Sequence, residues 1–304
     1  MIPVHGLLLV NKPAGLTSHD VVRQIRRIFH TRKVGHAGTL DPLATGVLPV
    51  AVGDGTKILQ FLLAENKSYR ATLKLGITTN TLDAEGEIVA ERPVPDITED
   101  VLQTVLDCYR GEIEQLPPMF SALKKDGVPL YKLAREGKTV ERELRRVTID
   151  RLDLIARTAD CITLEVDCSK GTYIRTLVSD IGDQLGCGAH LVELQRLQSG
   201  TFTIDECHTL DELKELEQPA TALISLDAAL RGFPAVRLND AAAAALRYGI
   251  PPQSEQTEPA DSLLTGQLVR LQIDQKLAAV GRYAPARMKE KRGDFELIRV
   301  FVSH

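Results

Sequence analysis

The residue types and spacing best suited to chemistry occur in one glycine-rich segment, residues 35–48, which reads GHAGTLDPLATGVL. Three glycines and a proline within twelve residues favour a tight, rigid loop, and Pro42 biases the preceding Asp41 away from helix. Backbone geometry would therefore hold the Asp41 carboxylate in place. Most isolated Asp-Pro pairs are turn residues, so this local pattern does not by itself establish catalysis.

Other catalytic chemistries have weaker support in the sequence. Residues 53–57, GDGTK, are glycine-rich but lack the order of a phosphate-binding P-loop, and no Rossmann G-x-G-x-x-G follows a strand. The G-x-S-x-G elbow of a Ser/His/Asp hydrolase is also missing. The chain holds 41 acidic residues, which offer many pairs, so spacing alone leaves the paired carboxylates of a glycosidase open.

The cysteines do not form a recognisable metal or redox motif. They are odd in number and lack CxxC pairing, which fits free thiols in a reducing compartment. Cys187 with His190, and Cys207 with His208, have ligand-like spacing, but such pairs arise readily by chance. We therefore expect no metal site.

The net charge of −4 does not point to nucleic acid, but the charges are unevenly distributed. Residues 21–40 contain five cations and no acid, whereas residues 205–217 contain six acids and one lysine. Residues 124–146 contain eight cations and four acids, in a Pro-, Gly- and charge-rich stretch. These two basic regions predict a footprint for phosphate on an otherwise acidic protein.

A helix is expected just before the Asp41 segment. Thr17 and Asp20 form a capping-box pattern, and apolar residues from Val21 to Phe29 recur at helical spacing. The opposite face carries Arg23, Arg26, Arg27 and His30. Such a face is either a solvated surface or a contact for phosphate.

Two strands and a second helix place further polar residues. Alternating apolar positions predict strands over residues 69–75, with Tyr69 on the apolar side, and over residues 162–168. A helix is expected from about Thr172, with Arg175 in its first turn. A cation there opposes the helix dipole, so Arg175 either points to water or pairs with an anion, and the local sequence favours water.

The chain length and composition predict a soluble protein of about two domains. No apolar run reaches the roughly 20 residues of a membrane span, and no secretory signal is visible, so we expect a cytoplasmic protein without a membrane partner. Residues 1–232 would form one domain, with a mobile basic insertion near residues 117–146. Residues 233–304 would form a small, mostly β domain, with an Ala-rich helix near 239–248 and strands near 268–273, 277–280 and 295–302.

Taken together, these motifs resemble a known family. Residues 35–48 are similar to the aspartate motif of pseudouridine synthases, specifically the bacterial tRNA pseudouridine-55 synthases of the TruB family. Further blocks follow in the family's order: NKPAGLTS at 11–18, KSYRA at 67–71, TLDAEG at 81–86, CSKGTYIRTL at 168–177 and the leucine motif at 191–200. The resemblance spans roughly residues 5–232. Residues 233–304 resemble the family's PUA-like RNA-binding domain more loosely.

The resemblance implies an α+β fold: a catalytic domain on a mixed, largely antiparallel sheet with flanking helices, followed by the small PUA-like domain. It implies an isomerase that detaches uracil from C1′ of uridine 55 in the T loop of tRNA and rejoins it through C5. The implied partner is the T stem-loop of tRNA, with no cofactor, no nucleotide cofactor and no metal. We expect a monomer.

The resemblance also assigns roles to residues. Asp41 would be the catalytic carboxylate, and Arg175 would pair with it and lower its pKa. Tyr69 would stack on the target uracil. The remaining substrate or RNA contacts would be His36 against the T loop, Leu194 as an apolar wall, Asp83 and Tyr173 near the substrate, and Arg23, Arg27 and Lys33 on phosphates. Lys12 would support the floor of the site.

Two alternatives remain at this point. A protein that binds or folds tRNA without chemistry would use the same surface. A pseudouridine synthase that acts on another RNA would share the same motifs.

Overall fold

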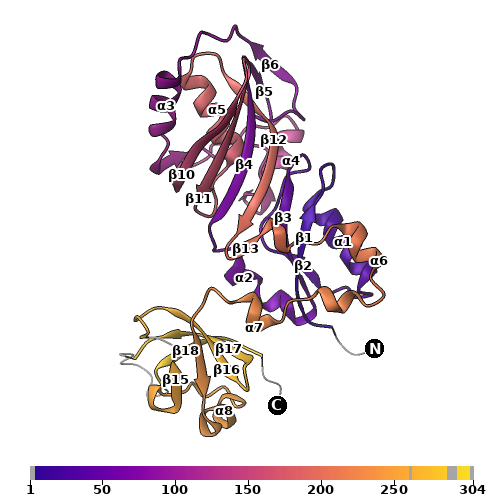
Figure 1. Ribbon diagram of the computed structural model, residues 1–304, viewed down its shortest axis with the longest axis vertical. Coiled ribbons are helices and arrows are strands. Elements are labelled where there is room, and N and C mark those ends of the chain that lie inside the picture. Colours follow the sequence, from indigo (N-terminus) through magenta and orange to yellow (C-terminus); the bar gives the residue numbers. More distant parts are fainter. Residues whose placement is uncertain (1–3, 260–261, 286–292, 302–304) are drawn as a thin grey trace.

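A computed structural model describes residues 4–259, 262–285 and 293–301, and within these ranges the chain builds two main sheets (Figure 1). The larger sheet has the strand order β1 (Gly6–Lys12), β3 (Thr45–Val52), β12 (Ala189–Ser199), β4 (Lys67–Leu75), β11 (Cys161–Cys168), β10 (Arg145–Arg157) and β7 (Gly111–Gln115). The short strands β2 (Val34–His36) and β13 (Phe202–Thr203) pair with β3 and β12. All these pairs are antiparallel except β3 with β12, so the sheet is mixed and largely antiparallel, as expected.

The helices flank this sheet and follow the predicted periodicities closely. Helix α1 (Ser18–Ile28) has the expected capping box, in which the Asp20 amide donates to the Thr17 hydroxyl at 3.1 Å and the Thr17 amide donates to the Asp20 carboxylate at 3.0 Å. Helix α3 (Glu99–Asp107) buries Leu102, Val105 and Leu106, and α5 (Ile174–Gln184) packs on β12 and β4. The other short elements are α2 (Leu59–Leu62), α4 (Leu130–Arg135), α6 (Leu210–Glu215), α7 (Leu226–Ala229), β5 (Ile77–Thr79), β6 (Ile88–Glu91), β8 (Lys124–Lys125), β9 (Val128–Pro129) and the 3₁₀ turns at residues 53–58, 204–206, 219–222 and 254–256.

One helix boundary differs from the expectation. The helix predicted from about Thr172 begins at Ile174, because Tyr173 has extended backbone angles and its amide donates to the side chain of Gln115 at 3.0 Å. The Thr172 hydroxyl instead donates to the carbonyl of Ser169 at 2.9 Å. Arg175 still lies in the first turn of α5, as predicted.

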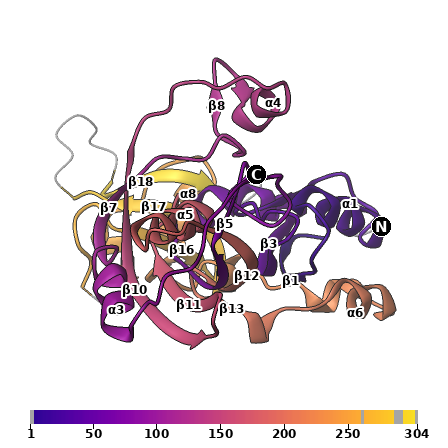
Figure 2. The same cartoon turned by 90° about the horizontal axis from the view of Figure 1, so that it is seen from above.

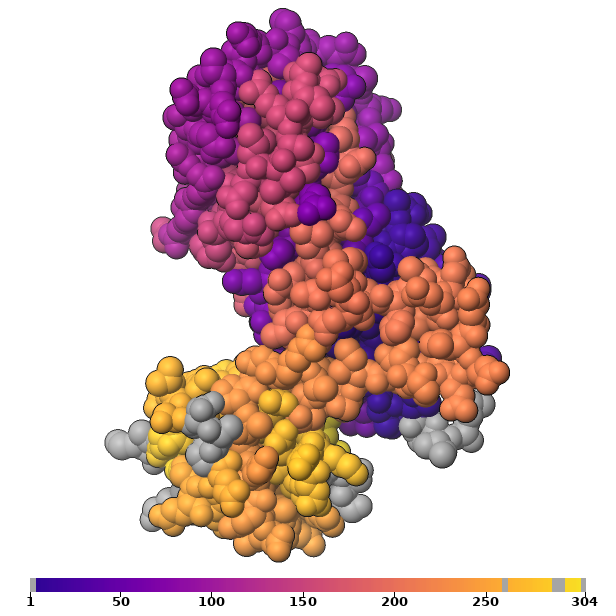
Figure 3. Space-filling model, viewed as in Figure 1, coloured from indigo at the N-terminus to yellow at the C-terminus, as the bar shows by residue number. Residues whose placement is uncertain are grey.

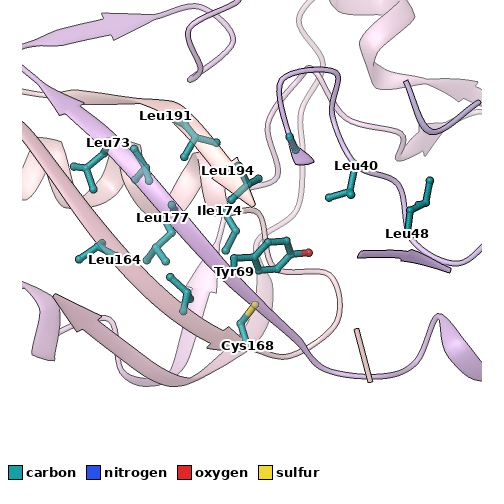
Figure 4. Close-up of a cluster of buried hydrophobic side chains, with 14 of the residues drawn as sticks. Leu40, Leu48, Tyr69, Leu73, Leu164, Cys168, Ile174, Leu177, Leu191 and Leu194 are labelled. Carbon is teal, nitrogen blue, oxygen red and sulfur yellow. The ribbon is translucent and has the colours of Figure 1, made fainter. Parts of the chain in front are cut away.

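One apolar core lies between α5 and the sheet. It combines alternate residues of β4 and β11 with one face of α5, including Leu73, Leu164 and Leu177. Figure 4 shows Tyr69 at the edge of this cluster, beside Ile174 and Cys168, with its hydroxyl directed away from Leu73 and Leu164. The alternation that predicts the strand therefore also places Tyr69 at the edge of the apolar core.

The smaller sheet has the order β15 (Thr257–Pro259), β14 (Ala235–Leu238), β16 (Leu268–Ile273), β17 (Lys276–Tyr283) and β18 (Phe295–Val300), with α8 (Asp240–Leu246) beside it. Val280 of this sheet belongs to one apolar cluster with Leu7 and Phe61, and an ion pair of 2.6 Å joins Arg270 to Asp227. Figure 3 shows this domain against the orange segment that precedes it. The end of the expected run at residue 302 lies outside the described residues.

Residues 117–146 contain β8, β9 and α4, which Figure 2 shows standing apart from the large sheet. The mobility of this insertion remains a prediction. Among the described residues, no helix combines the length and apolar character that crossing a bilayer would require.

Candidate active site

The loop that carries Asp41 joins β2 to β3 and is fastened from several sides. Its glycines Gly38 and Gly46 have φ angles of +88° and +100°, the left-handed region that glycine adopts without strain. The Ser18 hydroxyl of α1 accepts from the Leu40 amide at 2.8 Å, and the Pro42 carbonyl accepts from the Gly15 amide at 2.8 Å. These contacts fix the backbone on both sides of Asp41.

Lys12 lies directly beneath this loop and is completely buried. Its ammonium donates to the carbonyls of Pro13 at 2.9 Å, Leu16 at 2.6 Å and Pro42 at 3.2 Å. Burial lowers the pKa of Lys12 to about 8, although the nearby Asp41 acts in the opposite direction. The Lys12 ammonium therefore ties β1 to Pro42, the residue that follows Asp41.

Arg175 contacts both acids named from the sequence. Its Nε lies 3.0 Å from Asp41 Oδ2, and its Nη1 lies 3.2 Å from Asp83 Oδ2. The predicted ion pair between Asp41 and Arg175 is therefore present, and the local preference for water at Arg175 is wrong, since the side chain is buried. The same guanidinium donates to the carbonyls of Thr81 at 3.0 Å and Phe120 at 2.7 Å.

The expected effect of Arg175 on Asp41 needs a correction. The pKa of Asp41 is raised above its usual value, not lowered, because burial has the largest effect and Asp83 adds a like charge. Arg175 and Lys12 lower the pKa against these effects but do not outweigh them. The ion pair reduces the free-energy cost of burying the ionised Asp41 carboxylate, but it does not abolish that cost.

Asp41 and Arg175 line a cavity of about 290 Å³ together with three other predicted residues, Tyr69, Tyr173 and Leu194. Tyr69 is 8% exposed, and its backbone lies between Val166 of β11 and Arg196 of β12. Burial raises the pKa of the Tyr69 phenol, so it stays neutral. A planar apolar ring beside a carboxylate suits a small cyclic molecule that reacts at the carboxylate.

A second, larger cavity of about 600 Å³ shares Asp41 and Arg175 with the first. Its lining includes His36 and Asp83, so these two predicted residues line the far side of Asp41 and not the wall that holds Tyr69. The insertion adds Phe120, Tyr131 and Arg135. Within the described residues, Nδ1 of His36 is buried without a hydrogen-bond partner.

Three of the predicted phosphate contacts, Arg23, Arg27 and Lys33, lie outside both cavities. Arg23 pairs with Asp20 at 2.6 Å, and Lys33 pairs with Asp54. Arg27 is also exposed, and it has no carboxylate within ion-pair distance in the part of the chain that the structure describes. The positive charge of this basic region is therefore partly neutralised by the carboxylates of Asp20 and Asp54.

Sequence reasoning missed two buried cations that also line the smaller cavity, Lys67 and Arg196. The ammonium of Lys67 donates to the carbonyls of Leu63, at 3.4 Å, and Glu65. Burial lowers the pKa of Lys67 to about 8. Their positions were one available signal. Side chains of a strand alternate between its two faces, and both residues lie on the buried face, where an apolar residue is normal.

Comparisons with known proteins agree across most of the chain. Residues 26–174 match the family model described as TruB family pseudouridylate synthase (N terminal domain), and residues 175–232 match the tRNA pseudouridylate synthase B C-terminal domain. The tRNA pseudouridine synthase B of Syntrophotalea carbinolica is 51% identical over 98% of both chains. That of Geobacter sulfurreducens is 44% identical over 97% of this chain and 99% of its own.

Solved structures show the same architecture. A structure of an H/ACA RNP bound to a substrate RNA containing 2′-deoxyuridine has a chain with a TM-score of 0.76 and 27% identity, covering 98% of this chain and 85% of its own. A Cbf5-Nop10-Gar1 complex gives the same TM-score and coverage, with 29% identity. The overall fold therefore recurs in chains that share less than a third of their residues with this one.

Proposed function

The chain belongs to the TruB family of pseudouridine synthases, isomerases that form pseudouridine in tRNA, and from this we propose that it modifies uridine 55 in the T loop with Asp41 as the catalytic carboxylate. The observation that carries the proposal is the placement of Asp41. Its carboxylate lies 3.0 Å from the Arg175 guanidinium, in a cavity that it shares with Tyr69. An acid, its cation and a stacking surface thus surround one space.

The reaction breaks the bond between N1 of uracil and C1′ of ribose and forms a bond between C5 and C1′. A proton leaves C5 and a proton is added at N1, so atoms and electrons balance without an oxidant or reductant. An ionised Asp41 can attack as a nucleophile or stabilise positive charge at the sugar. Since burial raises the pKa of Asp41, the cations Arg175 and Lys12 act to keep the ionised form available near neutral pH.

Tyr69 supplies the surface on which the extruded uracil stacks. Taking a base out of an RNA stack costs a few kcal/mol, and stacking on an aromatic ring returns about 1–3 kcal/mol. Leu194 and Tyr173 close the same cavity and exclude water around the base. The apolar wall holds the uracil while its bond to the sugar is broken.

The second cavity would receive the rest of the T loop. His36 and Asp83 line it, and the segment around Phe120 brings the insertion to its edge. Arg23, Arg27, Lys33 and the cations of residues 124–146 would contact phosphates of the T stem-loop. We further propose that the protein acts as a cytoplasmic monomer, and that residues 233–304 form a PUA-like domain that adds RNA contacts.

Product mapping on an unmodified T stem-loop, and on full-length tRNA, tests the proposal. The wild-type protein should place pseudouridine at position 55, and Asp41→Asn, which cannot carry the charge, should bind the RNA and give no product. Binding without product by the wild type would favour a tRNA-binding or folding protein. Product on another RNA but not on tRNA would favour a different substrate.

A further inference from the structure

Arg196 is the largest fully buried side chain among the described residues, with 1% of its surface exposed. It lies in the C-terminal half of β12, and its guanidinium holds two backbone carbonyls: Nε donates to the carbonyl of Val47 at 2.6 Å, and Nη2 donates to that of Gly38 at 3.1 Å. A buried charge is costly unless it is hydrogen-bonded, so these contacts are strong constraints on the chain.

The two carbonyls flank the loop that carries Asp41. Gly38 precedes the acid and Val47 follows it, so one guanidinium spans both ends of the loop. The glycines of the loop allow this approach. A Cβ atom at Gly46 would lie 2.2 Å from the Arg196 carbonyl oxygen, and one at Gly38 would lie 3.3 Å from Nη1.

Arg196 also lies at the junction of the two halves of the large sheet. Strands β3 and β12 are joined by only two register pairs, Gln195 with Thr45 and Arg196 with Gly46. On one side are β1, β2 and β3 with Asp41, and on the other are β4, β11 and α5 with Tyr69 and Arg175. The groups that must act together thus come from opposite sides of a short connection.

The same residue faces Tyr69. Arg196 is the direct partner of Tyr69 in the antiparallel register of β12 and β4, and both line the smaller cavity. Arg196 therefore holds the Asp41 loop with its side chain, and its backbone pairs with Gly46 of β3 and with Tyr69 of β4.

We propose that Arg196 is a positioning residue that fixes the Asp41 loop relative to Tyr69 and Arg175. This inference rests on the proposed function, because its effect is measured as the rate of pseudouridine formation. A shift of about 1 Å in a reacting group can cost about a hundredfold in rate. Loss of the hydrogen bonds from Arg196 to Val47 and Gly38 should therefore slow the chemical step more than it weakens tRNA binding.

The experiment compares Arg196→Lys and Arg196→Met with the wild type, well below the melting temperature of each. Lysine keeps the charge but has one nitrogen, so it cannot span both carbonyls in the same way, and methionine removes the charge at similar length. Single-turnover rates with saturating tRNA report chemistry, and filter binding reports the Kd. Arg110→Met is the control, because Arg110 holds the carbonyl of Leu152, at 3.1 Å from Nε, outside both cavities.

We expect both Arg196 variants to lose about a hundredfold in single-turnover rate with less than about threefold change in Kd, and Arg110→Met to lower only the Tm. Folded variants with wild-type rates, or with losses confined to the Kd, would overturn the inference. So would failure of both Arg196 variants to fold, since the arginine would then act on stability alone. A wild-type protein that makes no pseudouridine would instead refute the proposed function, and the inference would fall with it.

Discussion

Asp41 and Asp83 share one cation, because Arg175 lies 3.0 Å from the first carboxylate and 3.2 Å from the second. When both acids are ionised, one guanidinium leaves a net charge of −1 in this cluster, and the other cation that lowers the pKa of Asp41, Lys12, is bound to carbonyls. The arrangement explains why the pKa of Asp41 is raised despite its ion pair: burial and Asp83 together outweigh Arg175.

The pH dependence of the reaction should follow from this cluster. Asp41 must be ionised to act, so the rate should rise with pH through its raised pKa. Asp83→Asn removes the like charge and should move this acid limb to lower pH, whereas Arg175→Met should move it to higher pH. Single-turnover rates between about pH 4 and about pH 8 would measure the limb.

The control for this pH profile is Asp180→Asn. Burial raises the pKa of Asp180 to about 6, but this residue lies outside both cavities. Its substitution should leave the acid limb in place. If Asp180→Asn moved the limb as far as Asp83→Asn does, the assignment of the limb to Asp41 would be wrong.

Asp41→Asn should make the folded protein more stable at neutral pH. A group whose pKa is raised by folding binds its proton more readily in the folded state, so its contribution to stability is present at low pH and is lost as pH rises through the folded pKa. The neutral amide of asparagine avoids this loss of stability, and Arg175 keeps its ion pair with Asp83. Melting curves should show a higher Tm for Asp41→Asn at pH 7, and a smaller difference at pH 4; a lower Tm at pH 7 would contradict this account.

Tyr69→Ala should reduce turnover far more than Tyr69→Phe. The phenyl ring retains the stacking surface. Loss of that surface costs about 1–3 kcal/mol per base, which is about five- to 150-fold in affinity for the extruded state. Alanine also leaves a void at the edge of the core, so the Tm of each variant must be compared. Equal losses in turnover would indicate a role for the hydroxyl instead of the ring.

Much of the fold could be predicted because the local patterns are strict. The alternation over residues 69–75 and 162–168 matches β4 and β11, and the capping box at Thr17 starts α1 as expected. These signals depend on the spacing of apolar residues within a single strand or helix, so they can be found without knowing the rest of the fold. Asp41 and Arg175 were found through motifs, and their separation in the sequence did not matter.

The features that sequence reasoning missed depend on contacts between distant segments. Arg196 and Lys67 interrupt apolar alternation, but their partners are backbone carbonyls that no pattern reveals. The direction of the Asp41 pKa depends on burial and on Asp83, which only the folded chain brings together. Similarly, His36 lines a second cavity because segments from five parts of the chain meet there.

Binding of tRNA should weaken steeply with salt, and Arg27 should account for part of that slope. Arg27→Gln removes one exposed cation and should reduce the slope by about one unit if it contacts a phosphate. Arg23→Gln should have a smaller effect, because Asp20 already pairs with Arg23 at 2.6 Å. Lys214→Gln, on the acidic helix α6, is the control and should leave the slope unchanged. A flat dependence for the wild type would count against all these phosphate contacts.

Gly46→Ala should damage the site more than the same exchange at a left-handed glycine that has room around it. An alanine Cβ at position 46 would lie 2.2 Å from the carbonyl oxygen of Arg196, where only backbone movement relieves the clash. Because this is one of two register pairs between β3 and β12, the movement should separate Asp41 from Tyr69. Gly111→Ala is the matched control: its φ of +85° imposes the same backbone strain, about 1 kcal/mol, but nothing lies within 4 Å. We expect both variants to lose some Tm and only Gly46→Ala to lose single-turnover rate; equal rates in the two would mean that β3 and β12 need no close contact for the chemistry.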